Sequence, residues 1–262
     1  MPFVKSNGLS IHYEIEGTSS AQPMMLHHGW TSDIEAWRDF GYIDALSDSY
    51  SLILIDARGH GLSDAPDGPE FYTPALFVDD VKVVLDASNL GPVIYWGYSM
   101  GAAVGFELMV DSPQLIKRFI SGGMHPYGNS TTGEPQTTNA TSTLRELGME
   151  GFVAKREKDL GGKIVPKLRN RLLAASANGL ASAGQAWAGW QGVKAQLSQV
   201  STKTLLYAGT GDALFHDGAM QAAEEMQDAS FIPVPRISHD AGFAASRTVL
   251  EYLDGFLDRR TD

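Results

Sequence analysis

From residue 93 the chain reads Val93-Ile94-Tyr95-Trp96-Gly97-Tyr98-Ser99-Met100-Gly101, an apolar run that ends in a Gly-x-Ser-x-Gly motif. A segment of small residues with helical spacing follows and continues to Val110. Strand, sharp turn and helix in this order form a nucleophile elbow, in which glycines avoid side-chain clashes and the serine oxygen is exposed. The helix also directs the positive end of its dipole towards the turn. The motif predicts that Ser99 is a nucleophile; alternatively, Ser99 only caps the helix.

The rest of the chain alternates apolar runs with segments of helical spacing, such as residues 78–85 and 100–110. Residues 9–17 alternate apolar and polar side chains, which predicts an exposed antiparallel strand in an amino-terminal hairpin. Right-handed crossovers place helices on both faces of such a sheet. We therefore predict a doubly wound, mostly parallel α/β sheet. The runs that suit strands buried on both faces are 24–26, 52–55, 93–96, 119–120, 205–208 and 231–234.

Residues 124–198 contain no strand-like run. We expect them to form a helical cap (lid) inserted over the sheet, with residues 1–123 and 199–262 as the core domain. Two tryptophans of the insertion, Trp187 and Trp190, are predicted to roof the substrate pocket, because aromatic walls suit a small, largely apolar group. Alternatively, they pack the cap against the core.

Composition excludes several classes of function. The net charge of −11 repels nucleic-acid phosphates and anionic membranes, so we expect neither as a partner. The absence of cysteine excludes disulfides, thiolate metal sites and cysteine nucleophiles. No apolar run approaches the roughly 20 residues that span a bilayer, and the first residues lack the pattern of a secretion signal. We expect a cytoplasmic protein, a monomer or homodimer, that needs no cofactor or metal.

A serine hydroxyl needs a base, and that base needs an acid to orient it. In open parallel sheets, ligands bind beyond the carboxyl ends of the strands, so the residues just after each apolar run are the candidates. Asp212 follows the run 205–208, and His239 follows the last run. The chain order Ser, Asp, His is the order that the nucleophile-elbow motif uses. We therefore predict a triad of Ser99, Asp212 and His239.

Four other side chains near these loops are alternatives: Asp217 and Asp240 for the acid, and His216 and His125 for the base. Asp217 lies past the loop. Asp240 directly follows His239, and an aspartate side chain rarely reaches a ring nitrogen of the adjacent residue. His125 follows the strand before the insertion, so it is predicted to line the pocket. As a base it would precede Asp212 and break the expected order.

Acyl transfer also needs donors for the developing oxyanion, usually backbone amides. One is the amide of Met100, directly after the nucleophile. The second is predicted at Trp30, in the sequence His27-His28-Gly29-Trp30 after the first predicted core strand. Gly29 lets the backbone turn tightly and the Trp30 ring walls the pocket; alternatively, this ring only packs in the core. The predicted pocket residues are His28, Gly29, Tyr98, His125, Trp187 and Trp190.

Several motifs together resemble those of the α/β-hydrolase family: His28-Gly29, Asp56-Ala57-Arg58-Gly59-His60-Gly61-Leu62-Ser63, Gly97-Tyr98-Ser99-Met100-Gly101, Gly209-x-x-Asp212 and Ser238-His239. The resemblance covers nearly the whole chain outside the insertion. It implies an eight-stranded sheet with a helical cap, and the same triad. In this family the Asp-x-Arg-Gly-x-Gly-x-Ser stretch is mainly architectural, so Asp56, Arg58 and His60 are expected to fix a loop.

The resemblance also narrows the chemistry. Family members that open epoxides or remove halide carry aspartate at the elbow, whereas this chain carries Ser99. The expected enzyme is a serine hydrolase that cleaves a small-molecule ester, lactone or related acyl compound through an acyl-enzyme. Two alternatives use the same triad: a haloperoxidase-like perhydrolase, and a C–C bond hydrolase with Arg145, Lys155 or Arg171 bound to a substrate carboxylate. A third is a non-enzymatic small-molecule receptor with this fold.

Overall fold

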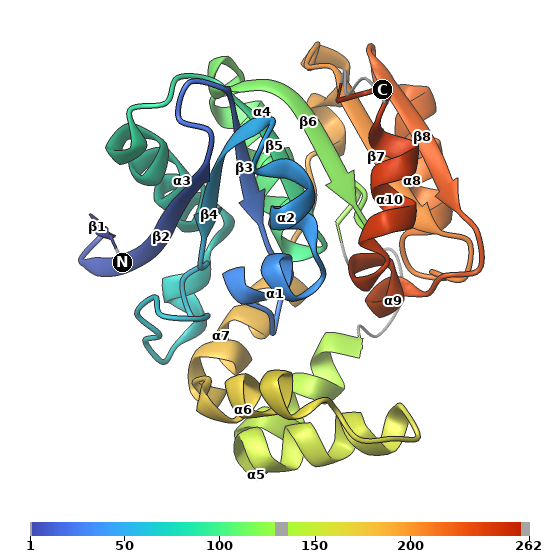
Figure 1. Ribbon diagram of the computed structural model, residues 1–262. Coiled ribbons are helices and arrows are strands. Elements are labelled where there is room, and N and C mark those ends of the chain that lie inside the picture. Colours follow the sequence, from blue (N-terminus) through green and yellow to red (C-terminus); the bar gives the residue numbers. More distant parts are fainter. Residues whose placement is uncertain (1, 129–135, 258–262) are drawn as a thin grey trace.

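The computed structural model describes residues 2–128 and 136–257. An eight-stranded sheet runs through the molecule in the order β1-β2-β4-β3-β5-β6-β7-β8 (Figure 1). Strands β1, β2 and β4 pair antiparallel, and every other neighbouring pair is parallel. The predicted mostly parallel α/β sheet is confirmed. Its strands are β1 (Phe3–Ser6), β2 (Leu9–Gly17), β3 (Gln22–His27), β4 (Tyr50–Ile55), β5 (Val93–Tyr98), β6 (Ile116–Gly122), β7 (Thr204–Gly209) and β8 (Ala229–Val234).

The central strands are apolar on both faces because each contributes side chains to two hydrophobic clusters. Successive side chains of a strand point to opposite faces, so Leu52 and Leu54 of β4 join one cluster while Ile53 and Ile55 join the other. The first cluster includes α1 (Ile34–Asp39), α2 (Tyr42–Leu46), α9 (His239–Ala244) and α10 (Ser246–Leu253). The second includes α3 (Pro74–Ser88), α4 (Met100–Asp111) and α8 (His216–Glu225). Helices on both faces make the sheet doubly wound.

Two features differ from, or add to, the predicted strands. The β1–β2 turn has positive φ at Asn7 (48°) and Gly8 (85°), the backbone of a two-residue hairpin turn. Strand β8, predicted to be buried on both faces, is buried only at Val234. That prediction is wrong because β8 is an edge strand, paired only with β7, and its place in the sheet is not visible in its own residues.

Helices gather beyond the carboxyl ends of the parallel strands (Figure 1). Residues 136–199, which we call the cap, hold α5 (Gln136–Asp159), α6 (Pro166–Ala174), α7 (Ala177–Ala188) and a 3₁₀ helix (Lys194–Gln199). Gly148, with φ 64° and ψ −165°, divides α5 into two helical parts. Residues 129–135 of the predicted insertion lie outside the described residues. Shorter 3₁₀ helices span Pro69–Tyr72 and Pro113–Leu115.

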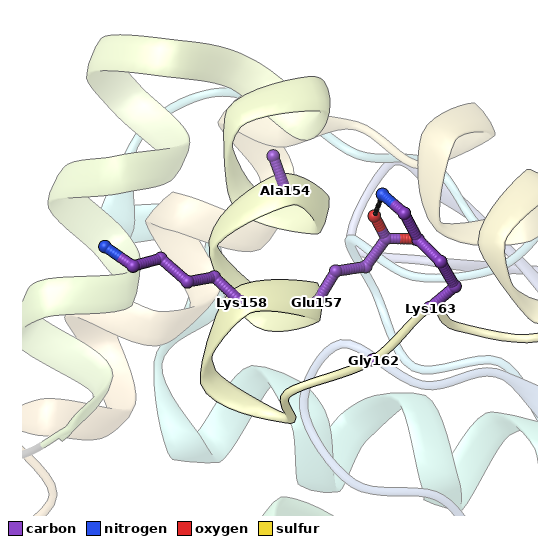
Figure 2. A pocket seen from close by; sticks show the side chains of 5 residues that line it. All are labelled: Ala154, Glu157, Lys158, Gly162 and Lys163. Carbon is purple, nitrogen blue, oxygen red and sulfur yellow. Dashed lines mark hydrogen bonds and ion pairs between the residues drawn. The ribbon is translucent and has the colours of Figure 1, made fainter.

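A pocket of about 300 Å³ lies within the cap and is lined by five residues, Ala154, Glu157, Lys158, Gly162 and Lys163. Figure 2 shows the ion pair between Glu157 and Lys163 at its rim, with 2.6 Å between the charged atoms. None of the predicted site residues lines it. Within residues 2–128 and 136–257, no helix combines the length and the apolar composition needed to cross a membrane.

Candidate active site

The elbow between β5 and α4 holds Ser99 in a backbone conformation that few residues adopt, with φ 51° and ψ −115°. Such strain persists only where the surroundings fix it. The Ser99 amide donates to the carbonyl of Gly122 on β6 at 2.8 Å. Gly101 is required because a Cβ there would lie 2.2 Å from the carbonyl oxygen of His27. Elbow and sheet are therefore packed too closely for a larger residue.

A continuous hydrogen-bond chain joins the three predicted triad residues. The Oγ of Ser99 is 2.9 Å from Nε2 of His239, and Nδ1 of His239 is 2.8 Å from Oδ2 of Asp212. The other Asp212 oxygen accepts from the amides of Leu214 and Phe215, each at 3.3 Å. With its carboxylate fixed, Asp212 selects the tautomer with a proton on Nδ1, which leaves Nε2 as the acceptor for the serine proton.

The alternative acids and bases have other partners. Nδ1 of His216 is 2.8 Å from Asp217, and Asp240 forms an ion pair with Arg156 of the cap at 3.3 Å. His125 is buried, and its ring packs on that of Phe215 with 5.5 Å between the ring centres. Burial lowers the pKa of His125. None of the four has a hydrogen bond to Ser99 among the described residues.

The two predicted oxyanion donors belong to segments next to Ser99. Met100 begins α4, and Trp30 lies in the loop between β3 and α1. A Cβ placed on Gly29 would be 3.2 Å from Cβ of Ser99, so this loop passes directly against the nucleophile. Within the part of the chain that the structure describes, neither the Met100 nor the Trp30 amide has a hydrogen-bond partner. Both are therefore free to bind an oxyanion.

Two predicted pocket residues, His28 and Tyr98, are buried and hold the surrounding loops. Nδ1 of His28 donates to the carbonyl of Gly29 at 2.8 Å, and its Nε2 accepts from the amide of Ala57 at 3.1 Å. His28 therefore joins the loops after β3 and β4. The hydroxyl of Tyr98 donates to the backbone carbonyl of His239, and its ring stacks on Phe243. Tyr98 thus supports the triad histidine through its backbone.

The predicted roof residues, Trp187 and Trp190, are buried where the cap meets the core. The Trp187 ring packs on Phe77 of α3 with 5.3 Å between ring centres. The Trp190 indole donates to a Glu107 carboxylate oxygen of α4 at 2.6 Å. Both tryptophans therefore pack against core helices and join the cap to the core, as in the alternative interpretation of these residues.

Sequence reasoning missed Phe215. Its ring lies 4.8 Å from that of His239, centre to centre, and its amide binds Asp212. Phe215 therefore contacts both His239 and Asp212. The signal was present in the sequence, because Phe215 lies three residues after Asp212, beyond the carboxyl end of β7, where ligand-facing residues gather.

Asp56, Arg58 and His60, which were expected to fix a loop, are buried. Asp56 accepts from Nδ1 of His12 at 2.7 Å and from the amides of Ile34 and Leu62 at 2.9 and 3.0 Å. Burial raises the pKa of Asp56, but these hydrogen bonds outweigh it and hold the pKa below its usual range. The Asp56 carboxylate thereby links β2, α1 and the loop after β4 through hydrogen bonds.

Two buried histidines near this carboxylate make the protein sensitive to acid. Burial lowers the pKa of His60 to about 3 and that of His27 well below its usual value. The unfolded chain binds these protons near pH 6.5, so the free energy of unfolding falls as pH drops below 6.5 and continues to fall to about pH 3. His60 contributes a loss of about 1.4 kcal/mol per pH unit in that window, and His27 adds a loss in the same direction.

We therefore expect urea midpoints to fall steadily between pH 6.5 and pH 5, above the range in which most carboxylates titrate. His60→Gln removes one of the two groups and should flatten the slope of stability against pH. Equal midpoints at pH 7 and pH 5 would contradict the burial of neutral histidines.

The cations considered for the C–C hydrolase alternative have partners of their own. Three cations proposed for a substrate carboxylate already pair with carboxylates: Arg145 with Asp67, Lys155 with Asp159, and Arg171 with Asp33 and Asp39. These pairs give the C–C hydrolase alternative no support. The described residues also hold no group of three or more His, Asp or Glu side chains arranged to bind a metal ion.

Comparisons with known proteins agree with this fold. The family model of the alpha/beta hydrolase fold matches residues 22–195. The chain is 27% identical to 3-oxoadipate enol-lactonase 2 of Acinetobacter baylyi, over 78% of this chain and 76% of that protein. It is 28% identical to Epoxide hydrolase 3 of Mus musculus, over 46% of this chain but only 32% of that protein's length. A solved enol-lactonase from Burkholderia xenovorans LB400 superposes with a TM-score of 0.83 at 22% identity, covering 98% of this chain and 100% of that one.

Proposed function

Because the chain belongs to the alpha/beta hydrolase fold family, we propose that it is a serine hydrolase that cleaves a small carboxylic ester or lactone. The observation that carries the proposal is the hydrogen-bond chain from Ser99 through His239 to Asp212. This is the arrangement in which a neutral hydroxyl becomes a nucleophile, because base and orienting acid are both within reach.

The nucleophile separates ester from epoxide chemistry. The family resemblance implies an aspartate at the elbow for epoxide opening, and this chain has Ser99 there. The mouse relative named as an epoxide hydrolase aligns with less than half of the chain. The relative named as an enol-lactonase aligns with 78% of it. Both facts support an acyl substrate.

The proposed reaction proceeds in two halves. As the Oγ of Ser99 attacks the acyl carbon, Nε2 of His239 takes its proton, and the amides of Met100 and Trp30 bind the oxyanion. His239 then gives the proton to the departing alcohol oxygen, which leaves an acyl-serine. A water molecule that loses a proton to His239 attacks this ester, and the acid departs as the proton returns to Ser99. In a lactone, the alcohol and the acid are parts of one product.

The test is covalent labelling combined with turnover. The folded wild type is expected to hydrolyse p-nitrophenyl acetate and butyrate and to gain one fluorophosphonate adduct per chain, located on the peptide that contains Ser99. Ser99→Ala should lose the adduct. Ser230→Ala, which removes an exposed serine of β8, is the matched control and should keep it. A folded wild type that gains no adduct would remove the acyl-serine mechanism and favour the receptor alternative.

A further inference from the structure

The loop from Gly29 to Asp33 carries the proposed Trp30 donor and is bound to the cap on both sides of a strained residue. We infer that the cap positions the oxyanion hole: the side chains of Trp30 and Asp33, bonded to α7 and α6, hold the Trp30 amide in place against Ser99. This inference rests on the proposed function. It assigns positioning roles to the Trp30 indole and to Arg171.

The first attachment is the Trp30 side chain itself. Its indole Nε1 donates to the carbonyl of Leu180 in α7 at 2.9 Å. One turn further along α7, a Cβ placed on Gly184 would lie 2.6 Å from the indole ring. Helix α7 therefore rests directly on the ring, and only a glycine fits there. The residue whose amide is the proposed second donor thus has its side chain fixed by the cap.

The second attachment is Asp33, three residues further along the loop. Its Oδ2 accepts from Nε of Arg171 in α6 at 2.9 Å, while its Oδ1 accepts from the amide of Ala36 at 3.2 Å and caps α1. The same guanidinium reaches Asp39 at the end of α1, at 2.6 Å. Both side chains of the Arg171–Asp33 pair are less than a fifth exposed, so water screens it less than a surface pair.

Between the two attachments the backbone is strained. Thr31 has φ 64°, in the left-handed region that β-branched residues rarely adopt. The turn is closed by a bond of 3.2 Å from the amide of Ser32 to the carbonyl of Gly29. A strained conformation lasts only where its surroundings fix it, and here two of the fixing contacts come from the cap.

The two donors of the hole therefore differ in what holds them. The Met100 amide follows an elbow tied to β6 of the core through Ser99 and Gly122. The peptide unit that carries the Trp30 amide is held from the core by His28, which donates to its Gly29 carbonyl, and the cap adds the attachments of the Trp30 and Asp33 side chains. A donor acts only when it lies about 2.7–3.1 Å from the oxyanion, and a displacement of about 1 Å lowers the rate about 100-fold. Displacement of the cap would remove the attachments on both sides of Thr31 and loosen the Trp30 side of the hole, and docking of the cap would restore them.

Two substitutions loosen these attachments without touching the triad. Trp30→Phe keeps an aromatic ring but removes the indole donor, and Arg171→Gln removes the charge that binds Asp33. Each should lower kcat for p-nitrophenyl butyrate about 10-fold, a partial displacement of the donor, with KM within about twofold. Lys167→Gln is the matched control: it breaks the ion pair of the same helix α6 with Asp39 and leaves both loop attachments intact, so kcat should stay unchanged.

A second readout separates positioning from a general loss of stability. An aryl boronic acid forms a tetrahedral adduct on Ser99 and places an oxygen in the hole, so its inhibition constant should rise by the same factor as kcat falls. Wild-type values of kcat and inhibition constant in a folded Trp30→Phe, with Arg171→Gln likewise unchanged, would overturn the inference while the ester hydrolysis stands. A wild type without turnover and without boronic-acid binding would remove the proposed function and this inference with it.

Discussion

His239→Gln is expected to lower kcat for p-nitrophenyl esters by about 10⁶-fold, because no other base in residues 2–128 and 136–257 has a hydrogen bond to Ser99. Nε2 of His239 lies 2.9 Å from Ser99 Oγ and is the proposed acceptor of its proton. Glutamine can fill part of the space, but its amide does not accept a proton at neutral pH. The measurement is kcat under saturating ester, with circular dichroism to show that the fold is kept.

A rival histidine provides the control. His216→Gln should leave kcat unchanged, because Nδ1 of His216 pairs with Asp217 and not with the triad. The loss of kcat in Asp212→Asn should lie between those of the two histidine variants, at about 10⁴-fold, because the amide favours the wrong tautomer of His239. The double variant Ser99→Ala/His239→Gln should be no slower than His239→Gln alone, since the triad acts as a unit. A loss of less than about 100-fold in His239→Gln would assign the base to another group.

The sequence predicted most where the signal is local. A nucleophile elbow is built from neighbours in the chain, so Gly97 and Gly101 with the apolar run before them indicate the turn without any tertiary information. The order of Asp212 and His239 after successive strands then selected two residues that the structure brings within hydrogen-bond distance of each other. Strand alternation likewise indicated the doubly wound sheet, which the strand order confirms.

The sequence predicted least where two distant segments meet. His28 directly precedes the loop from Gly29 to Asp33, yet its ring nitrogens bind backbone atoms of two different loops. The cap tryptophans contact Phe77 of α3 and Glu107 of α4, and no local sequence pattern gives that orientation. The Trp30 contact with Leu180 joins residues 150 positions apart. Contacts between residues so far apart in the sequence are set by tertiary packing, which local sequence patterns do not reveal.

Arg58→Met is expected to lower the free energy of unfolding by about 3–5 kcal/mol, the largest effect on stability that we predict. Nε and Nη2 of Arg58 donate to the two oxygens of Asp80 in α3 at 2.7 and 2.6 Å, and both residues are 1% exposed. The third guanidinium nitrogen, Nη1, donates to the carbonyl of Phe71 at 2.7 Å. Methionine fills much of the volume but leaves the Asp80 carboxylate buried without its counter-charge, and the measurement is urea unfolding at pH 7.

The double variant Arg58→Met/Asp80→Leu distinguishes the net stabilisation by the ion pair from the destabilisation caused by one unpaired buried charge. Removing both charges avoids the desolvation of either, so this variant should recover most of the stability that Arg58→Met alone loses. The ester activity of the double variant should also stay near that of the wild type, because Arg58 and Asp80 bind each other and lie outside the triad and its donors. If the double variant were as unstable as the single one, the guanidinium would be needed chiefly for its bond to Phe71, and the loop before α3 would depend on that bond.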